Sequence, residues 1–129
     1  MNIILIDTNF YADIMFGKKE AMDIIHHSEK ILISPIVLGE LLYGFKNGTH
    51  EKDNIHQLEM FLQASSVQEI FLTKKTAQYF AAISAQLKKQ GTPIPTNDIW
   101  IAACAMEHAA ALVTRDQHFD NIHNLILFK

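Results

Sequence analysis

The chain has 129 residues, of which 49% are hydrophobic and 19% are charged, so its composition is that of a folded globular protein rather than a disordered one. A chain of this length is expected to form one domain over residues 1–129, because two separate cores would each be too small. The formal net charge of -3 excludes the strongly basic character of many nucleic-acid-binding proteins, although carboxylates that hold metal ions would contribute to such a balance. Cys104 is the only cysteine, and the sequence shows neither a signal peptide nor an apolar run of about 18 residues. We therefore expect a cytoplasmic protein with no internal disulfide and no membrane partner.

Short apolar runs alternate with longer amphipathic segments along the chain. The first run is entirely apolar and ends at Asp7, which is typical of a strand buried on both faces of a sheet. Apolar residues at helical spacing predict helices between such runs. The expected strands lie at 3–6, 31–33, 112–113 and 125–128, a short apolar stretch lies at 70–72, and the expected helices lie at 35–47, 55–62, 77–90 and 97–108. This order predicts an α/β fold with a parallel sheet flanked by helices.

Four acidic residues are expected at one edge of this sheet. Asp7 directly follows the first strand, and Asp116 comes just after the third. Asp98 lies in the first turn of the alanine-rich helix, and Glu40 lies within the first two turns of the helix that follows the second strand. Ligands of open α/β sheets bind beyond the carboxyl ends of the strands. These carboxylates are therefore expected to form a common site, which Asp120 could join.

Each acid also has a structural explanation when it is taken alone. Asp7 could cap a helix, Asp98 could complement a helix dipole, and Asp116 could open a turn. Glu40 is harder to explain in this way, because it lies among leucines on a helix face that should point inward. The coincidence of four acids from four segments favours a common site.

Crowded carboxylates predict a bound cation. At a separation of about 4 Å they repel by about 1–4 kcal/mol per pair, and a cation removes that repulsion. Oxygen ligands select hard ions, so Mg²⁺ or Mn²⁺ is expected, and zinc is disfavoured because the sequence has no cysteine pair and no two histidines separated by three residues. Such an ion activates water for phosphodiester hydrolysis. The histidines are interpreted as surface or cap residues that do not pair with these acids, although His118 could touch a substrate.

The four acids also lie in segments that resemble the motifs of the PIN-domain superfamily, and specifically those of VapC-type toxins. The segments are 6–9, 34–44, 93–103 and 112–119. Each motif alone has little specificity, but four of them in family order, over nearly the whole chain, are specific. The resemblance implies one PIN domain with a central sheet of four or five parallel strands flanked by helices. It also implies endonucleolytic cleavage of RNA that depends on Mg²⁺ or Mn²⁺.

The resemblance further implies roles for individual residues and partners for the protein. The implied catalytic and metal-binding residues are Asp7, Glu40, Asp98 and Asp116, and the implied supporting residues are Thr8, Asn9 and Thr114. The implied partners are a second copy of the chain and a cognate antitoxin protein that covers the site. Among the cationic residues, Arg115 is the expected contact with a substrate phosphate, because it lies between Thr114 and Asp116.

These features predict the toxin component of a type II toxin–antitoxin system. One alternative is a PIN-type nuclease for RNA processing or DNA cleavage that has no toxin role. A second is a PIN-like module that binds nucleic acid or protein without catalysis. A third, a phosphatase with an aspartyl nucleophile, is disfavoured because Asn9 stands where a second aspartate is needed. Tyr43 and Phe45 are expected either in the core or in a partner surface, and the residues expected in the core are Trp100, Cys104 and Phe119.

Overall fold

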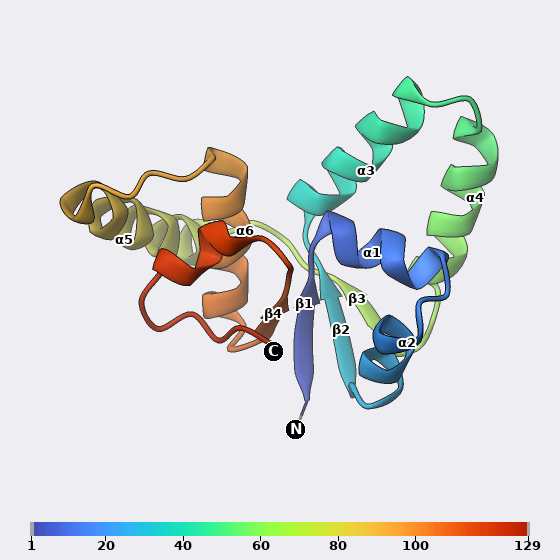
Figure 1. Ribbon diagram of the computed structural model, residues 1–129, viewed down its shortest axis with the longest axis horizontal. Helices are drawn as coiled ribbons and strands as arrows, with labels where there is room; N and C mark the ends of the chain where they lie inside the picture. The colour runs from blue at the N-terminus through green and yellow to red at the C-terminus, as the bar shows by residue number, and fades with distance from the viewer. Residues whose placement is uncertain (1, 129) are drawn as a thin grey trace.

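Four parallel strands form the central sheet of the protein, which a computed structural model describes over residues 2–128. The strands are β1 (Ile3–Ile6), β2 (Lys30–Ile33), β3 (Val67–Glu69) and β4 (Ala111–Val113), and they lie in the order β3-β2-β1-β4 (Figure 1). Leu5 of β1 lies opposite Leu32 of β2 on one side and Leu112 of β4 on the other. The first and last strands of the chain are therefore neighbours, and their carboxyl ends lie side by side.

Within residues 2–128, six α-helices lie between the strands along the chain, and one short 3-10 helix follows the last strand. They are α1 (Thr8–Met15), α2 (Lys19–His26), α3 (Pro35–Asn47), α4 (Glu51–Leu62), α5 (Lys74–Gln90), α6 (Thr96–Glu107) and η1 (Gln117–Asn121). The predicted α/β fold is confirmed, and the sheet has four strands. The sequence did not predict α1 and α2, because each has only eight residues and they bury just three side chains between them.

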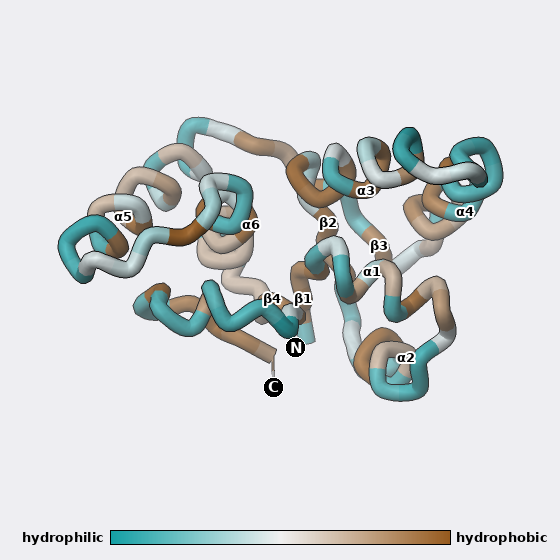
Figure 2. Tube along the Cα trace, turned by 45° about the horizontal axis from the view of Figure 1, so that its top comes forward, coloured by the Kyte–Doolittle hydropathy of each residue, from teal (hydrophilic) through white to brown (hydrophobic). Residues whose placement is uncertain are grey.

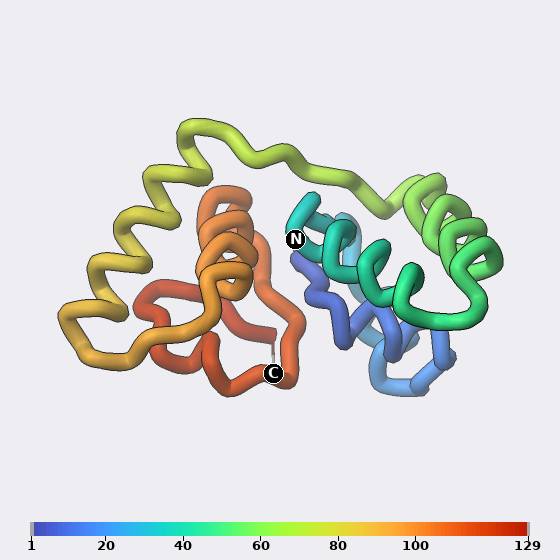
Figure 3. The backbone as a smooth tube through the Cα atoms, turned by 90° about the horizontal axis from the view of Figure 1, so that it is seen from above, coloured from blue at the N-terminus to red at the C-terminus, as the bar shows by residue number. Residues whose placement is uncertain are grey.

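The direction of the crossovers explains how the helices are distributed. The chain moves outward from β1 to β2 to β3, and then crosses back to place β4 on the far side of β1. Since nearly all such crossovers are right-handed, the reversal places α5 and α6 on the opposite face of the sheet from α1 to α4. The two groups of helices are separate in Figures 1 and 3. The reversal creates a crevice at the carboxyl ends of β1 and β4, which is where doubly wound sheets bind ligands.

The core lies between the central strands and the helices, and it contains two of the three side chains expected there, Cys104 and Phe119. Figure 2 shows hydrophobic residues along β1 and hydrophilic residues at the outer ends of α4 and α5. Phe119 and Cys104 are fully buried, and burial raises the pKa of the Cys104 thiol to about 12, so this thiol is inert. Trp100 stacks on Phe80 with ring centroids 4.1 Å apart. Trp100 is half-buried and packs on α5 outside the buried core, so the prediction that it lies in the core is wrong.

One predicted strand is not a strand in the structure. The expected strand at 125–128 is reduced to one parallel bridge between Leu112 and Leu127, because the last segment only crosses the edge of β4. Two backbone hydrogen bonds hold this segment to Leu112, and Ile126 is exposed. The sequence did not predict β3, which ends at Glu69 just before the apolar stretch at 70–72, and Phe71 in that stretch is 76% exposed.

The predicted helix positions are confirmed, and local interactions explain where the helices begin and end. Ser34 accepts a hydrogen bond from the backbone N–H of Val37 at the start of α3, and a capping box of Thr73 and Thr76 starts α5. Gly91 ends α5 in the left-handed conformation, with φ 71°. Among residues 2–128, every helix is too short or too polar to cross a lipid bilayer.

Candidate active site

Asp7 links the end of β1 to the start of α1. Its side chain is the N-cap of α1 and accepts a hydrogen bond of 2.8 Å from the backbone N–H of Phe10. The residue is only 6% exposed. Burial raises the pKa of the Asp7 carboxyl, and the negative charge of Asp116 acts in the same direction, while Thr114 and Arg115 oppose the shift. The capping explanation considered for Asp7 is therefore correct, and the cap also fixes the carboxylate at the carboxyl end of the sheet.

Asp116 and Asp98 are held in place by comparable local structure. Asp116 is the N-cap of η1 and accepts a hydrogen bond of 2.9 Å from the backbone N–H of His118, and its own N–H donates to Thr114 Oγ1. Asp98 lies in the first turn of α6. Burial raises the pKa of the Asp98 carboxyl, His118 opposes the shift, and the negative charges of Asp116 and Glu40 add to it. The expected turn and helix-start roles are real, and they position the two carboxylates.

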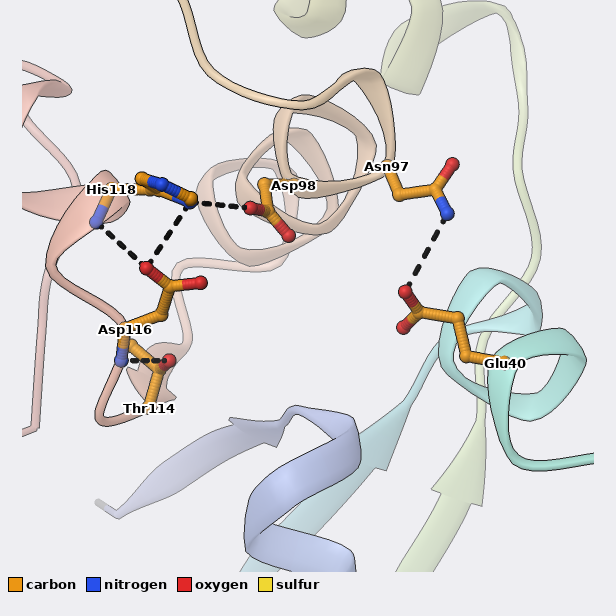
Figure 4. A network of polar contacts seen from close by, with 6 residues as sticks. All are labelled: Glu40, Asn97, Asp98, Thr114, Asp116 and His118. Atoms are coloured by element: carbon orange, nitrogen blue, oxygen red, sulfur yellow. Dashed lines mark hydrogen bonds and ion pairs between the residues drawn. The ribbon is translucent and has the colours of Figure 1, made fainter. Parts of the chain in front are cut away.

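Glu40 faces this group from α3 and is held by two donors from other segments. Thr8 Oγ1 donates a hydrogen bond of 2.7 Å to Glu40 Oε1. Asn97 Nδ2 donates one of 3.5 Å to Glu40 Oε2, and Figure 4 shows this second bond. Thr8, which was expected only as a supporting residue, thus bonds across to the second motif. Asn97 was not among the predicted site residues. Its position directly before Asp98, in the first turn of α6, is the only sign of its role in the sequence.

One cleft of about 270 Å³ unites the predicted residues. Its polar lining residues are Asp7, Thr8, Asn9, Glu40, Asp98 and Asp116. Thr114 adjoins the cleft through its bond to the backbone of Asp116. Asp120 is exposed and, with Asp116, lines a separate smaller hollow. The structure thus brings together the four acids that the sequence placed at one sheet edge, and it leaves Asp120 outside their cleft.

The acids that line this cleft fit a hard divalent cation. Four carboxylates present oxygen atoms to the cleft, and burial together with neighbouring negative charge raises the pKa of both Asp7 and Asp98. A protein that keeps carboxylates under such conditions gains stability when a cation neutralises them. Oxygen ligands of this kind suit Mg²⁺ or Mn²⁺.

The interpretation of all histidines as unrelated to the acids is wrong for His118. Its Nδ1 atom lies 3.2 Å from Asp98 Oδ2 and 3.2 Å from Asp116 Oδ1 (Figure 4). The two acids and the histidine come from α6 and η1, 20 residues apart in sequence. The η1 turn brings them together, and although a turn at Asp116 was considered, the sequence did not place His118 beside the acids.

Arg115 lies beside the acidic cleft but has a partner of its own. Its Nη2 atom is 3.4 Å from Asp13 Oδ1, and Lys18 Nζ is 3.1 Å from the same oxygen. These three residues, together with Asp7, line a second cleft of about 400 Å³ on the side of α1 and α2. The Arg115 side chain is 64% exposed and carries the positive charge closest to the acids in the sequence, so it stays available to an anionic ligand.

Comparisons with known proteins agree with this geometry. The family model of the PIN domain matches residues 4–125. The ribonuclease VapC2 of Rickettsia felis is 32% identical over 127 residues, which are 98% of this chain and 91% of the relative. The ribonuclease VapC2 of Haemophilus influenzae is 31% identical over 116 residues, which are 87% of this chain and 85% of the relative.

Solved structures of related proteins have the same fold. VapBC2 from Rickettsia felis, bound to a DNA fragment from its promoter, matches with a TM-score of 0.86 at 30% identity, over 98% of this chain and 97% of that chain. DNA-bound VapBC from Salmonella typhimurium matches with a TM-score of 0.88 at 24% identity, over 99% of this chain and 98% of that chain, a likeness of fold alone. The chain belongs to the PIN-domain family and, within it, to the VapC ribonucleases.

Proposed function

We propose that this protein is the toxin of a type II toxin–antitoxin pair and acts as a metal-dependent endoribonuclease. The observation that carries the proposal is the convergence of four carboxylates, from four separate segments, on one cleft in a member of the VapC family. The whole chain, residues 1–129, then forms one PIN domain. An enzyme of this kind meets its RNA in the cytoplasm.

The residues of the cleft have different roles in phosphodiester hydrolysis. Asp7, Asp98 and Asp116, together with Glu40 from α3, would hold Mg²⁺ or Mn²⁺ at the carboxyl ends of β1 and β4. When bound, the ion supplies an activated water and neutralises charge on the phosphate. Glu40, whose two oxygens are fixed by Thr8 and Asn97, accepts a hydrogen bond from the attacking water and orients it.

The remaining polar residues support the acids and the substrate. Asn9 lines the same cleft, and Thr114 holds the backbone of the segment that carries Asp116. Arg115 contacts a phosphate of the RNA next to the cleaved bond, since its guanidinium is exposed beside Asp7. Its bond to Asp13 then exchanges for the bond to phosphate.

The proposal includes two protein partners. Relatives with the same fold form VapBC toxin–antitoxin complexes, and we assign this chain a cognate antitoxin that covers the acidic cleft. We also assign it a homodimer. Large exposed apolar side chains support such contacts, with Phe71 76% exposed and Tyr43 68% exposed. Phe45, by contrast, packs partly against the core.

Incubation of the purified protein with total cellular RNA and Mg²⁺ or Mn²⁺ tests the nuclease activity. We expect discrete cuts, which sequencing of the new RNA ends maps to a small number of sites. The cuts should disappear in the Asp7→Asn and Asp98→Asn variants and persist in Glu59→Gln, which removes an exposed carboxylate on α4. A folded wild-type protein that leaves all RNA intact with either metal would instead support a binding module without catalysis.

A further inference from the structure

His118 lies where a ligand of the proposed metal ion is needed. Asp98, Asp116 and His118 each offer one ligand atom, and these three atoms all lie within 4.8 Å of one another. The shortest separations join His118 Nδ1 to one oxygen of each aspartate, at 3.2 Å in both cases (Figure 4). The imidazole therefore faces both carboxylates at once.

Local structure holds the imidazole in this position. Asp116 caps η1 by accepting from the backbone N–H of His118, so the backbone of His118 is tied to the same carboxylate that its ring approaches. The next residue, Phe119, is 1% exposed and anchors η1 in the core. Asp116 and Phe119, on either side of His118, are both held in place. The His118 ring therefore lies beside the acids although its side chain is 50% exposed.

The separations match those between neighbouring ligands of one ion. In octahedral coordination with metal–ligand bonds of about 2.1 Å, adjacent ligand atoms lie about 3 Å apart. Nδ1 of His118 has this spacing from Asp98 Oδ2 and from Asp116 Oδ1. The histidine can thus join both aspartates on one ion with little movement.

We propose that His118 is a nitrogen ligand of the metal ion held by Asp98 and Asp116, and that it makes the site prefer Mn²⁺ over Mg²⁺. This inference rests on the proposed metal-dependent function and identifies the cation more narrowly. Mg²⁺ is a hard ion that binds oxygen almost exclusively, whereas first-row transition ions also accept imidazole nitrogen. Replacing one oxygen ligand by nitrogen therefore weakens Mg²⁺ binding relative to Mn²⁺ binding.

Pulsed electron paramagnetic resonance of the Mn²⁺-loaded protein tests the nitrogen ligand directly. We expect a ¹⁴N hyperfine coupling to Mn²⁺ in the wild type, its loss in His118→Gln, and its retention in His56→Gln, which changes an exposed histidine on α4. Calorimetric titration with each metal should show that His118→Gln weakens Mn²⁺ binding about tenfold. The same variant should change Mg²⁺ affinity much less, since glutamine offers an oxygen in place of the nitrogen.

The outcomes separate this inference from the function on which it rests. If Mn²⁺ binds to the wild type without ¹⁴N coupling, or if His118→Gln keeps the coupling, His118 is not a ligand and the inference is overturned while the metal site stands. If the wild type binds neither ion, the proposed metal site fails and the role of His118 fails with it. Circular dichroism and thermal unfolding of each variant establish that it is folded before its metal binding is compared.

Discussion

Thr8 Oγ1 donates a hydrogen bond of 2.7 Å to Glu40 Oε1, and this bond joins the segment after β1 to the helix after β2. Asn97 holds the other oxygen of the same carboxylate from α6. Three of the four sequence motifs therefore meet at Glu40. The orientation of this carboxylate depends on residues that carry no charge.

Thr8→Val should slow RNA cleavage by removing the donor to Glu40. We expect a decrease in kcat of about tenfold or more, because a misoriented carboxylate no longer positions the attacking water. The affinity for the metal ion should change less, because Thr8 does not bind the ion. Single-turnover cleavage of a defined RNA and calorimetric titration with Mn²⁺ measure the two quantities. Thr8→Ser keeps the hydroxyl and should retain most activity, and an equal defect in Thr8→Ser would show that the hydrogen bond is not the reason.

Asp7→Asn should stabilise the metal-free protein at neutral pH. The folded-state pKa of Asp7 is raised above its ordinary value of 3.8, mainly by burial, so the native state binds more protons than the unfolded state between these two values. The contribution of Asp7 to the stability of the folded protein is therefore fully present below its ordinary pKa, and it is lost as the pH rises through its raised folded-state pKa. Asparagine carries no charge and still caps α1. The free energy of unfolding of Asp7→Asn should exceed that of the wild type by a small amount near about pH 4 and by more near about pH 7.

Urea unfolding in the presence of a chelator measures this difference at both pH values. A variant that is markedly less stable than the wild type at neutral pH would show that Asp7 serves chiefly as a structural cap. Addition of Mn²⁺ should reverse the order, because only the wild type then gains stability from binding.

Arg115→Ala should weaken RNA binding mainly through charge. Asp7→Asn serves as the background, because we expect this variant to bind RNA without cutting it. In that background, loss of one phosphate contact should reduce the slope of log K against log salt by about 0.7, the value for one contact with a single strand. Fluorescence anisotropy with labelled RNA over a series of salt concentrations gives the slope. Lys88→Ala, at the end of α5, is a control that removes the same charge. An identical decrease of the salt slope in both variants would contradict a specific phosphate contact at Arg115.

Thr76→Val should destabilise the protein without affecting the site. The Thr76 hydroxyl is fully buried and donates to the carboxylate of Glu107, which ties the start of α5 to the end of α6. Valine removes this donor to Glu107 and also the hydroxyl that accepts from the backbone N–H of Thr73 in the capping box, which should lower the free energy of unfolding by about 1–3 kcal/mol. Urea unfolding measures the loss, and Mn²⁺ titration should give an unchanged Kd. Thr76→Ser should recover much of the stability, and no loss in either variant would rule out a structural role for this bond.

The sequence was sufficient to place the acids but not the groups that surround them. Asp7 and Asp116 were predictable because each follows an apolar strand, and parallel strands end at one edge of the sheet. Asp98 and Glu40 were predictable from helices that begin at that edge. His118 and Asn97 were not, because their contacts depend on how α6 meets η1 and α3, and no local pattern encodes those distances.

In the fold too, local apolar patterns predicted some elements correctly, while tertiary contacts decided the structure of others. Strands that are buried on both faces gave clear apolar runs, and residues 3–6 were predicted with correct bounds. Leu125 to Phe128 are equally apolar, yet the sheet edge supports only one bridge there, and Leu125 and Leu127 pack against the core without forming a strand. Apolar composition alone does not distinguish a central strand from a segment that covers an edge.

Equilibrium binding of Mn²⁺ to the chelator-treated protein tests the common metal site most directly. We predict binding by the wild type and by Glu59→Gln, and a loss of at least tenfold in affinity for Asp98→Asn and for Asp7→Asn, about the smallest effect expected when a ligand is removed. Equal affinity in all four proteins, each shown to be folded, would contradict the account. It would mean that these acids gather at the sheet edge only as caps and turn residues.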